Sequence, residues 1–268
     1  MKMFADGFVN YDKQFIKKKI VSGKLLLVMA YLRLRASYSG KVIMSIDYLA
    51  ESLGYRPNKK TGKINESIVE SLLWLKQKDY ISFDMDIRNR DNHSKCFVCQ
   101  INNDNNIFDM IRDDNVNYKA FVQITEEEFD RIINSPYKRK DCLFVVFMHM
   151  KKRICINGVG QDGNYCFASL DTIQRDASNN VKISRSSVAN VIDELVRIGL
   201  LFEHITGEYV DCHEKLRAAV NFYSLREELM NHDECDAIAK FYIEENEGVI
   251  VDNFIKKGIR YERTRIAV

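Results

Sequence analysis

An internal repeat constrains this chain more than any other feature of its sequence. The segment Ser45-Ile46-Asp47-Tyr48-Leu49 recurs 124 positions later as Ser169-Leu170-Asp171-Thr172-Ile173. An apolar run precedes each segment, and apolar residues at helical spacing follow it, in the same order in both halves. We therefore expect one structural unit that is built twice, with insertions at its turns. The other matches are residues 7–10 with 120–123, residues 25–29 with 143–147, and Ile68, Leu72 and Leu75 with Val188, Ile192 and Leu195.

Each copy has the same order of expected elements. An apolar helix leads to a short strand, then to a helix opened by Ser-x-Asp, and then to an amphipathic helix with one apolar face. A β-hairpin closes each copy. In the second copy, Ser184 is a natural N-cap and Gly199 ends the last helix. The expected helices are 24–36, 45–53, 65–78, 138–153, 169–177 and 184–198, the strands are 41–45 and 165–169, and the hairpins are 80–87 with 96–101 and 200–205 with 208–212.

Three helices followed by a β-hairpin form the winged-helix arrangement. We therefore expect an α+β fold of two tandem winged helix-turn-helix domains, mostly helical with β-hairpin wings. The first domain is expected at residues 1–103, an acidic linker at 104–118, the second domain at 119–212 and a helical tail at 213–268. We also expect a fragment of residues 115–212 to fold by itself.

Charge is distributed unevenly, although the 40 Lys and Arg residues nearly balance the 38 Asp and Glu residues. Residues 1–100 carry 18 basic and 10 acidic side chains, and residues 131–210 carry 11 and 8. Residues 101–130 between them carry 2 basic and 8 acidic side chains. Two basic blocks around an acidic connector are typical of two modules that bind a polyanion. The alternative is an ordinary fluctuation of charge along the chain.

The sequence predicts a cytoplasmic protein outside the membrane. Its longest apolar runs, residues 25–32 and 142–150, are shorter than the roughly 20 residues that a membrane-spanning helix needs. The first residues lead into a Lys-rich amphipathic stretch, which is unlike a secretory signal. Seven cysteines, an odd number scattered through apolar runs, favour reduced thiols.

The expected DNA-binding surface is centred on the last helix of the second copy. A helix in the major groove must offer hydrogen-bond donors from its first turns to phosphates and base edges. Arg185 can form two hydrogen bonds with guanine, and Asn190 can form two with adenine. Lys182 and Ser184 are candidates for contacts with phosphates. Ser186 lies on the same turn. This helix is the better candidate for reading bases.

The first copy has a more mixed surface, whose basic turn and wing predict a grip on the phosphate backbone. Glu66 and Glu70 lie on the same helix, and acidic side chains beside phosphates are unfavourable. The alternative for each charged candidate is an ordinary solvated face. The candidates in this copy are Arg56, Lys59, Lys60, Lys63, Asn65 and Ser67 around the helix start, and Arg88, Arg90 and Lys95 in the wing.

The remaining motifs do not point to catalysis. The G-x-G-x-x-G of residues 158–163 follows an expected helix and precedes a strand, the reverse of the dinucleotide fingerprint, so we interpret it as a turn. Cys96 and Cys99 form a C-x-x-C near His93, but no second pair completes a zinc site. The sequence also lacks nucleophile-elbow, phosphate-loop and zinc-protease motifs. We expect no enzyme activity, no cofactor and no metal.

A family resemblance rests mainly on residues 120–205. Phe121-Val122-Gln123-Ile124, a long apolar helix, the turn Ile156-Asn157-Gly158 with Asp162-Gly163, and the strand at 165–169 resemble the N-terminal domain of plasmid replication initiators of low-GC Gram-positive bacteria. With two winged-helix copies, the chain is similar to initiators of theta-replicating plasmids and related phages. The resemblance implies sequence-specific binding of double-stranded DNA at an origin, recruitment of host replication proteins and no catalysis.

Other functions stay open at this point. A winged-helix transcription regulator would have the same elements, and a replisome or partition scaffold would use its winged helices for protein contacts. A homodimer, formed through the surface near Trp74, is a further alternative. The tail at 213–268 matches no pattern of the family.

Overall fold

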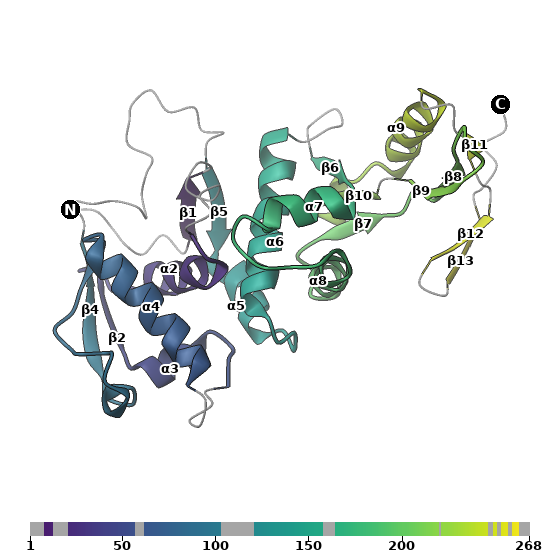
Figure 1. Ribbon diagram of the computed structural model, residues 1–268. Coiled ribbons are helices and arrows are strands. Elements are labelled where there is room, and N and C mark those ends of the chain that lie inside the picture. The colour runs from purple at the N-terminus through teal and green to yellow at the C-terminus, as the bar shows by residue number, and fades with distance from the viewer. Residues whose placement is uncertain are drawn as a thin grey trace.

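The computed structural model describes residues 8–12, 21–56, 62–102, 121–157, 164–219, 221–245, 249–250, 253–256 and 259–262. These residues form an α+β protein of helices and small antiparallel sheets (Figure 1). The expected acidic linker at 104–118 and the Gly-rich turn at 158–163 lie outside the described residues.

The first copy of the repeat has the expected order of elements, with helix boundaries within two residues of those predicted. Ser22 and Ser45 cap its first two helices, because each hydroxyl accepts a hydrogen bond from a backbone N–H three residues on. The three strands form a sheet in which the last strand lies in the middle. The elements are α2 (Gly23–Arg35), β2 (Lys41–Met44), α3 (Ile46–Ser52), α4 (Lys63–Gln77), β3 (Ile81–Ser82) and β4 (Phe97–Ile101).

The second copy repeats this order and this strand arrangement. Its sheet has the order β6-β10-β7, which matches β2-β4-β3 of the first copy. A further helix that the sequence patterns did not reveal, α5 (Glu126–Asn134), begins with a capping box of Thr125 and Glu128. The other elements are α6 (Lys140–Asn157), β6 (Tyr165–Ala168), α7 (Leu170–Ala177), α8 (Arg185–Arg197), β7 (Phe202–His204) and β10 (Asn221–Ser224).

The predicted hairpin of the second copy, 200–205 with 208–212, is wrong. Strand β7 pairs with β10, whereas β8 (Glu208–Val210) pairs with β9 (Leu216–Ala218) and β11 (Val249–Ile250). Two local causes explain the difference. Asp211 closes the β8–β9 turn by accepting hydrogen bonds from the N–H groups of His213 and Lys215. Phe222 and Tyr223 of β10 are fully buried, so β10 takes the central place in the sheet.

The chain beyond residue 212 is more than a helical tail. The helix of this segment is α9 (His232–Glu245), which follows β10 and a short 3-10 turn at Glu227–Leu229. Strands β12 (Asn253–Lys256) and β13 (Ile259–Glu262) pair with each other. Cys235 and Ala239 of α9 join a small apolar cluster with Tyr165 and Phe222 of the sheet. Strand β10 and helix α9, which both follow residue 212, are therefore part of the second copy.

The two copies share one apolar core. Helices α2 and α6 pack against each other near the middle of the molecule (Figure 1). Both helices are apolar on all sides, and residues 25–32 and 142–148 are almost completely buried. A helix without a polar face must be covered all round. Each of the two helices therefore supplies part of the cover of the other.

Strands β1 (Phe8–Asp12) and β5 (Phe121–Thr125) join the copies symmetrically. They are antiparallel, and Asn10 lies opposite Gln123, its equivalent in the repeat. An antiparallel pair centred on equivalent residues relates its two strands by a local two-fold axis, as in the isologous interface of a dimer. The strands β1 and β5, one from each copy, are therefore related by a local two-fold axis.

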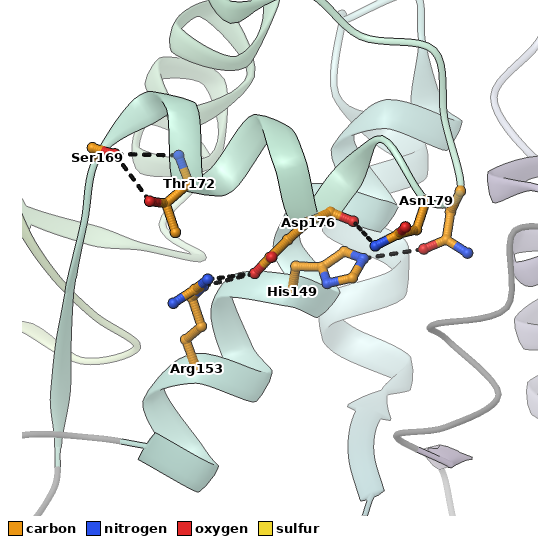
Figure 2. A network of polar contacts seen from close by, with 7 residues as sticks. His149, Arg153, Ser169, Thr172, Asp176 and Asn179 are labelled. Carbon is orange, nitrogen blue, oxygen red and sulfur yellow. Dashed lines mark hydrogen bonds and ion pairs between the residues drawn. The ribbon is translucent and has the colours of Figure 1, made fainter.

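Polar contacts fasten α2 to the second copy. The N–H of Gly23 donates to the backbone carbonyl of Asn180 at 2.8 Å, and Nδ2 of Asn180 donates to the carbonyl of Val21 at 2.8 Å. His149 of α6 approaches Oδ1 of Asn180 through Nε2 at 3.1 Å. Figure 2 shows His149 beside the turn after α7.

Helix α7 is held to α6 by a half-buried ion pair close to His149. Nε and NH2 of Arg153 contact Oδ2 of Asp176 at 2.9 and 2.5 Å (Figure 2). The hydroxyl of Ser169 accepts from the N–H of Thr172 at 3.2 Å and so caps α7. These contacts hold α7, the helix that precedes α8, against α6.

Candidate nucleic-acid interface

The N-terminal end of α8 is open to solvent. Ser184 is its N-cap, and the hydroxyl accepts a hydrogen bond from the N–H of Ser187 at 3.2 Å. The first turn contains no acidic residue. The structure brings the five second-copy candidates together here, all of them exposed: Lys182, Ser184, Arg185, Ser186 and Asn190.

Arg185 is held only weakly. Its Nε lies 3.0 Å from Oδ1 of Asp171, and the two side chains are 62% and 70% exposed. An ion pair this exposed contributes roughly 0–1 kcal/mol, because water and salt screen it. Arg185 can therefore exchange Asp171 for a stronger partner at small cost.

Arg139, which sequence reasoning missed, extends this surface. It lies in the loop before α6, and its NH1 donates to the carbonyl of Lys182 at 3.0 Å. Its neighbour Lys138 is also exposed. The basic run at 138–140 is visible in the sequence, but only the tertiary contact places it beside the start of α8. The cationic surface is therefore wider than predicted.

Tyr55, the neighbour of Arg56 in the first copy, contacts the second copy close to Arg139. The neighbouring Tyr55 accepts a hydrogen bond through its hydroxyl from the N–H of Asp141 at 3.1 Å, two residues from Arg139. Nζ of Lys24 lies 3.2 Å above the Tyr55 ring. Burial lowers the pKa of Lys24 to about 8, against the opposing effect of Asp141. The exposed Arg56 is thus next in the chain to a residue that joins the two units.

The N-terminal turn of α4, the counterpart of α8, is covered by the loop between β3 and β4. Asn65, predicted as a DNA contact, is buried instead, and its Nδ2 donates to Oδ1 of Asp47 at 2.7 Å. It also lies 3.4 Å from Nδ1 of His93, a buried residue of the β3–β4 loop. Nε2 of His93 contacts the carbonyl of Ile87 at 3.1 Å. This loop therefore folds back onto α4, which takes Asn65 out of reach of a groove.

Charge also distinguishes α4 from α8. By the repeat, Arg185, Ser186 and Asn190 correspond to Asn65, Glu66 and Glu70. Glu66 forms an ion pair with Arg90, so Arg90 is engaged within the first copy. Ser67 is half-buried and donates to the carbonyl of Ile64 at 2.8 Å, which also removes it from the predicted surface. The first copy presents carboxylates where the second presents the hydroxyl of Ser186 and the amide of Asn190, and it has the buried Asn65 where the second has Arg185.

Three of the other first-copy candidates remain at the surface. Lys63, Arg88 and Lys95 are exposed, and Lys95 donates to Oδ1 of Asn92 at 2.8 Å. Lys59 and Lys60 lie outside the described residues. A grip on phosphates by this copy stays a prediction.

Neither the cysteines nor the helices suggest another kind of site. Cys99 is buried in β4, and burial raises the pKa of its thiol to about 12, while Cys96 is exposed. Within the described residues, no three His, Cys, Asp or Glu side chains are grouped to hold a metal ion. No helix in this part of the chain has the length and apolar character needed to cross a bilayer. Comparison with protein families, curated proteins and solved structures finds no match to this chain.

Proposed function

We propose that this chain is a sequence-specific double-stranded DNA-binding protein built from two winged-helix units. The supporting observation is the N-terminal end of α8. It is capped by a side chain, its first turn contains no carboxylate, and Lys182, Arg185 and Asn190 are exposed there together. The common order of helices and strands in both copies supports the winged-helix assignment. In such units, the helix before the first wing strand enters the major groove.

The two units have different roles in this proposal. Helix α8 reads base edges, since Arg185 can hold guanine and Asn190 can hold adenine. In this proposal Arg139, which is bonded to the carbonyl of Lys182, and the exposed Arg56 contact phosphates of the same site. Helix α4 does not read bases, because Glu66 and Glu70 would repel the phosphates.

The biological role that we propose is replication initiation on a plasmid or phage. It follows from the sequence resemblance in residues 120–205 and from the tandem arrangement. The local two-fold relation at β1 and β5 supports it too, because a covalent pseudo-dimer can place two DNA-contacting surfaces on one duplex. A plasmid that carries only this gene and its flanking DNA, with a selectable marker, tests the role directly by its ability to replicate.

DNA binding is tested with the duplex that flanks the gene, by fluorescence anisotropy against a random duplex of equal length. Arg185→Ala should weaken specific binding by about 1–3 kcal/mol and affect random DNA less. Arg197→Ala is the matched control, because Arg197 is an exposed arginine at the other end of α8, paired with Glu194. Equal losses on both duplexes would make Arg185 a phosphate contact, and no loss would exclude α8 as the reading helix.

A further inference from the structure

A cleft of about 600 Å³ lies between the two copies, and none of the residues that line it is assigned to DNA. Val42 and Ile43 of β2 line one side of it, and Asp130 and Ile133 of α5 line the other. Tyr48 of α3 also lines it and is 56% exposed. Binding sites often form at the junction of two structural units, as this cleft does.

The cleft runs beside the free edge of a sheet. In the order β2-β4-β3, strand β2 lies at the edge. The carbonyl of Gly40 accepts from the N–H of Ile101, so by antiparallel alternation Val42 bonds to β4 and Ile43 turns its N–H and C=O outward. The outward carbonyl of Lys41 is already used by the N–H of Ser37. Ile43 therefore offers a backbone donor and acceptor to an added strand.

Apolar side chains gather around this edge. Ile43 is 71% exposed, and Val98, directly opposite on β4, is 47% exposed. Tyr38 and Tyr48 bring the group to four of the eight large apolar side chains that are exposed in the described part of the chain. Single exposed apolar residues are normal, but a group beside a cleft marks an interaction surface.

The charge of the cleft favours a cationic partner. Arg35 in its wall is engaged by two carboxylates of α5, Glu126 and Asp130. Glu51, which also lines the cleft, is exposed and forms no ion pair within the described residues. Lys41 is exposed on β2 but is not part of the wall. The lining therefore has an excess of negative charge.

We propose that this cleft binds an extended segment of another protein in which an apolar side chain is flanked by Lys or Arg. The segment adds to β2 through the N–H and C=O of Ile43, a mode in which the main chain provides affinity and side-chain pockets provide specificity. Its apolar side chain lies against Ile43, Tyr48 and Ile133, and its cation reaches Glu51. The first copy, whose helix α4 does not read bases, thus has a second role in binding a protein partner. This proposal does not depend on DNA binding.

The test selects random nine-residue peptides displayed on phage against the full-length chain. Enriched peptides should alternate apolar residues with Lys or Arg and lack a central Pro. An enriched peptide is then synthesised, and its Kd is measured by fluorescence anisotropy for the wild type, Ile43→Pro, Glu51→Gln and the control Glu70→Gln, an exposed glutamate on α4.

Ile43→Pro removes the outward N–H but leaves the bonds of β2 to β4, as prolines on edge strands do. This substitution should weaken binding of the peptide about 3–10-fold, the loss expected for one backbone hydrogen bond. Glu51→Gln should weaken peptide binding less, and Glu70→Gln should leave the Kd of the peptide unchanged. Circular dichroism checks that Ile43→Pro folds. If it does not, Ile43→Thr, which keeps the backbone and replaces the apolar contact, should still weaken the peptide.

Several results would overturn the proposal. These are the absence of an enriched basic and apolar consensus, binding that none of the Ile43 variants weakens, or a consensus with helical i, i+3, i+4 spacing. A dimer in solution that Ile43→Pro dissociates would also overturn it, since the occupant would then be a second copy of this chain.

Discussion

His149 shows how a single buried residue connects the stability of this protein to pH. Burial lowers the pKa of its imidazole, and the hydrogen bond with Asn180 opposes that shift. Because Nδ2 of Asn180 donates to Val21, its Oδ1 must accept, and the neutral imidazole carries its proton on Nε2. The folded chain therefore resists taking a second proton at this ring.

We predict an acid-sensitive contribution to stability from His149. Below its unfolded pKa of about 6.5, the unfolded chain binds a proton that the folded chain excludes. The free energy of unfolding should therefore fall with decreasing pH, by at most about 1.4 kcal/mol per pH unit from this group. Urea denaturation at pH 7.5, 6.5 and 5.5 measures it, and His149→Gln, which can still donate to Asn180, should show a shallower slope. Identical slopes would mean that His149 titrates alike in both states.

At the scale of elements, Gly54 fixes how α3 of the first copy meets α5 of the second. Its φ is +74°, and a Cβ at this position would collide with the carbonyl of Ile133 and with Lys140. Gly199, at the end of α8, has a similar φ of +69°, but a Cβ there would meet only the flexible end of Arg131. Substitutions at Gly54 and Gly199 therefore distinguish the cost of a left-handed backbone from the cost of disturbing the contact between the copies.

Gly54→Ala should destabilise the protein more than Gly199→Ala. The left-handed backbone costs about 1–2 kcal/mol in either variant, and the collision at Gly54 adds about 1–3 kcal/mol. Thermal or urea denaturation of both variants measures the difference. Equal losses would mean that α3 and α5 separate easily, which would also loosen the cleft between them.

At the scale of the whole molecule, the shared core makes the two copies interdependent. A fragment of residues 115–212 lacks α2, which covers α6, and β10, the central strand of its sheet. The expectation that it folds by itself therefore lacks structural support. A fragment of residues 119–245 restores β10 and α9 but still leaves α6 uncovered on the side of α2.

We predict that the 119–245 fragment has no cooperative unfolding transition and binds hydrophobic dyes, whereas the full chain unfolds cooperatively. Exposed faces of α6 would cost about 25 cal/mol for each Å² of apolar surface left in water. Circular dichroism and dye fluorescence of the two proteins, measured side by side, decide this. A cooperative fragment that binds DNA as tightly as the whole chain would show that the first copy supports neither folding nor binding.

The sequence by itself determined where most helices and strands lie. N-caps, such as Ser45, Ser169 and Ser184, and apolar spacing act within a few residues, so they can be recognised locally. The repeat added the common order of elements in the two halves. The C-terminal end of α8 at Gly199 was also correct.

Only the tertiary structure decided which residues are exposed and which strands pair. Asn65 and Arg185 occupy equivalent positions in the first turns of α4 and α8, yet Asn65 is buried beside Asp47 and His93, whereas Arg185 is exposed. The choice of β10 as the partner of β7, and the position of Arg139 beside Lys182, are likewise contacts between distant segments. Such contacts depend on competition for burial over the whole chain, which no local pattern contains.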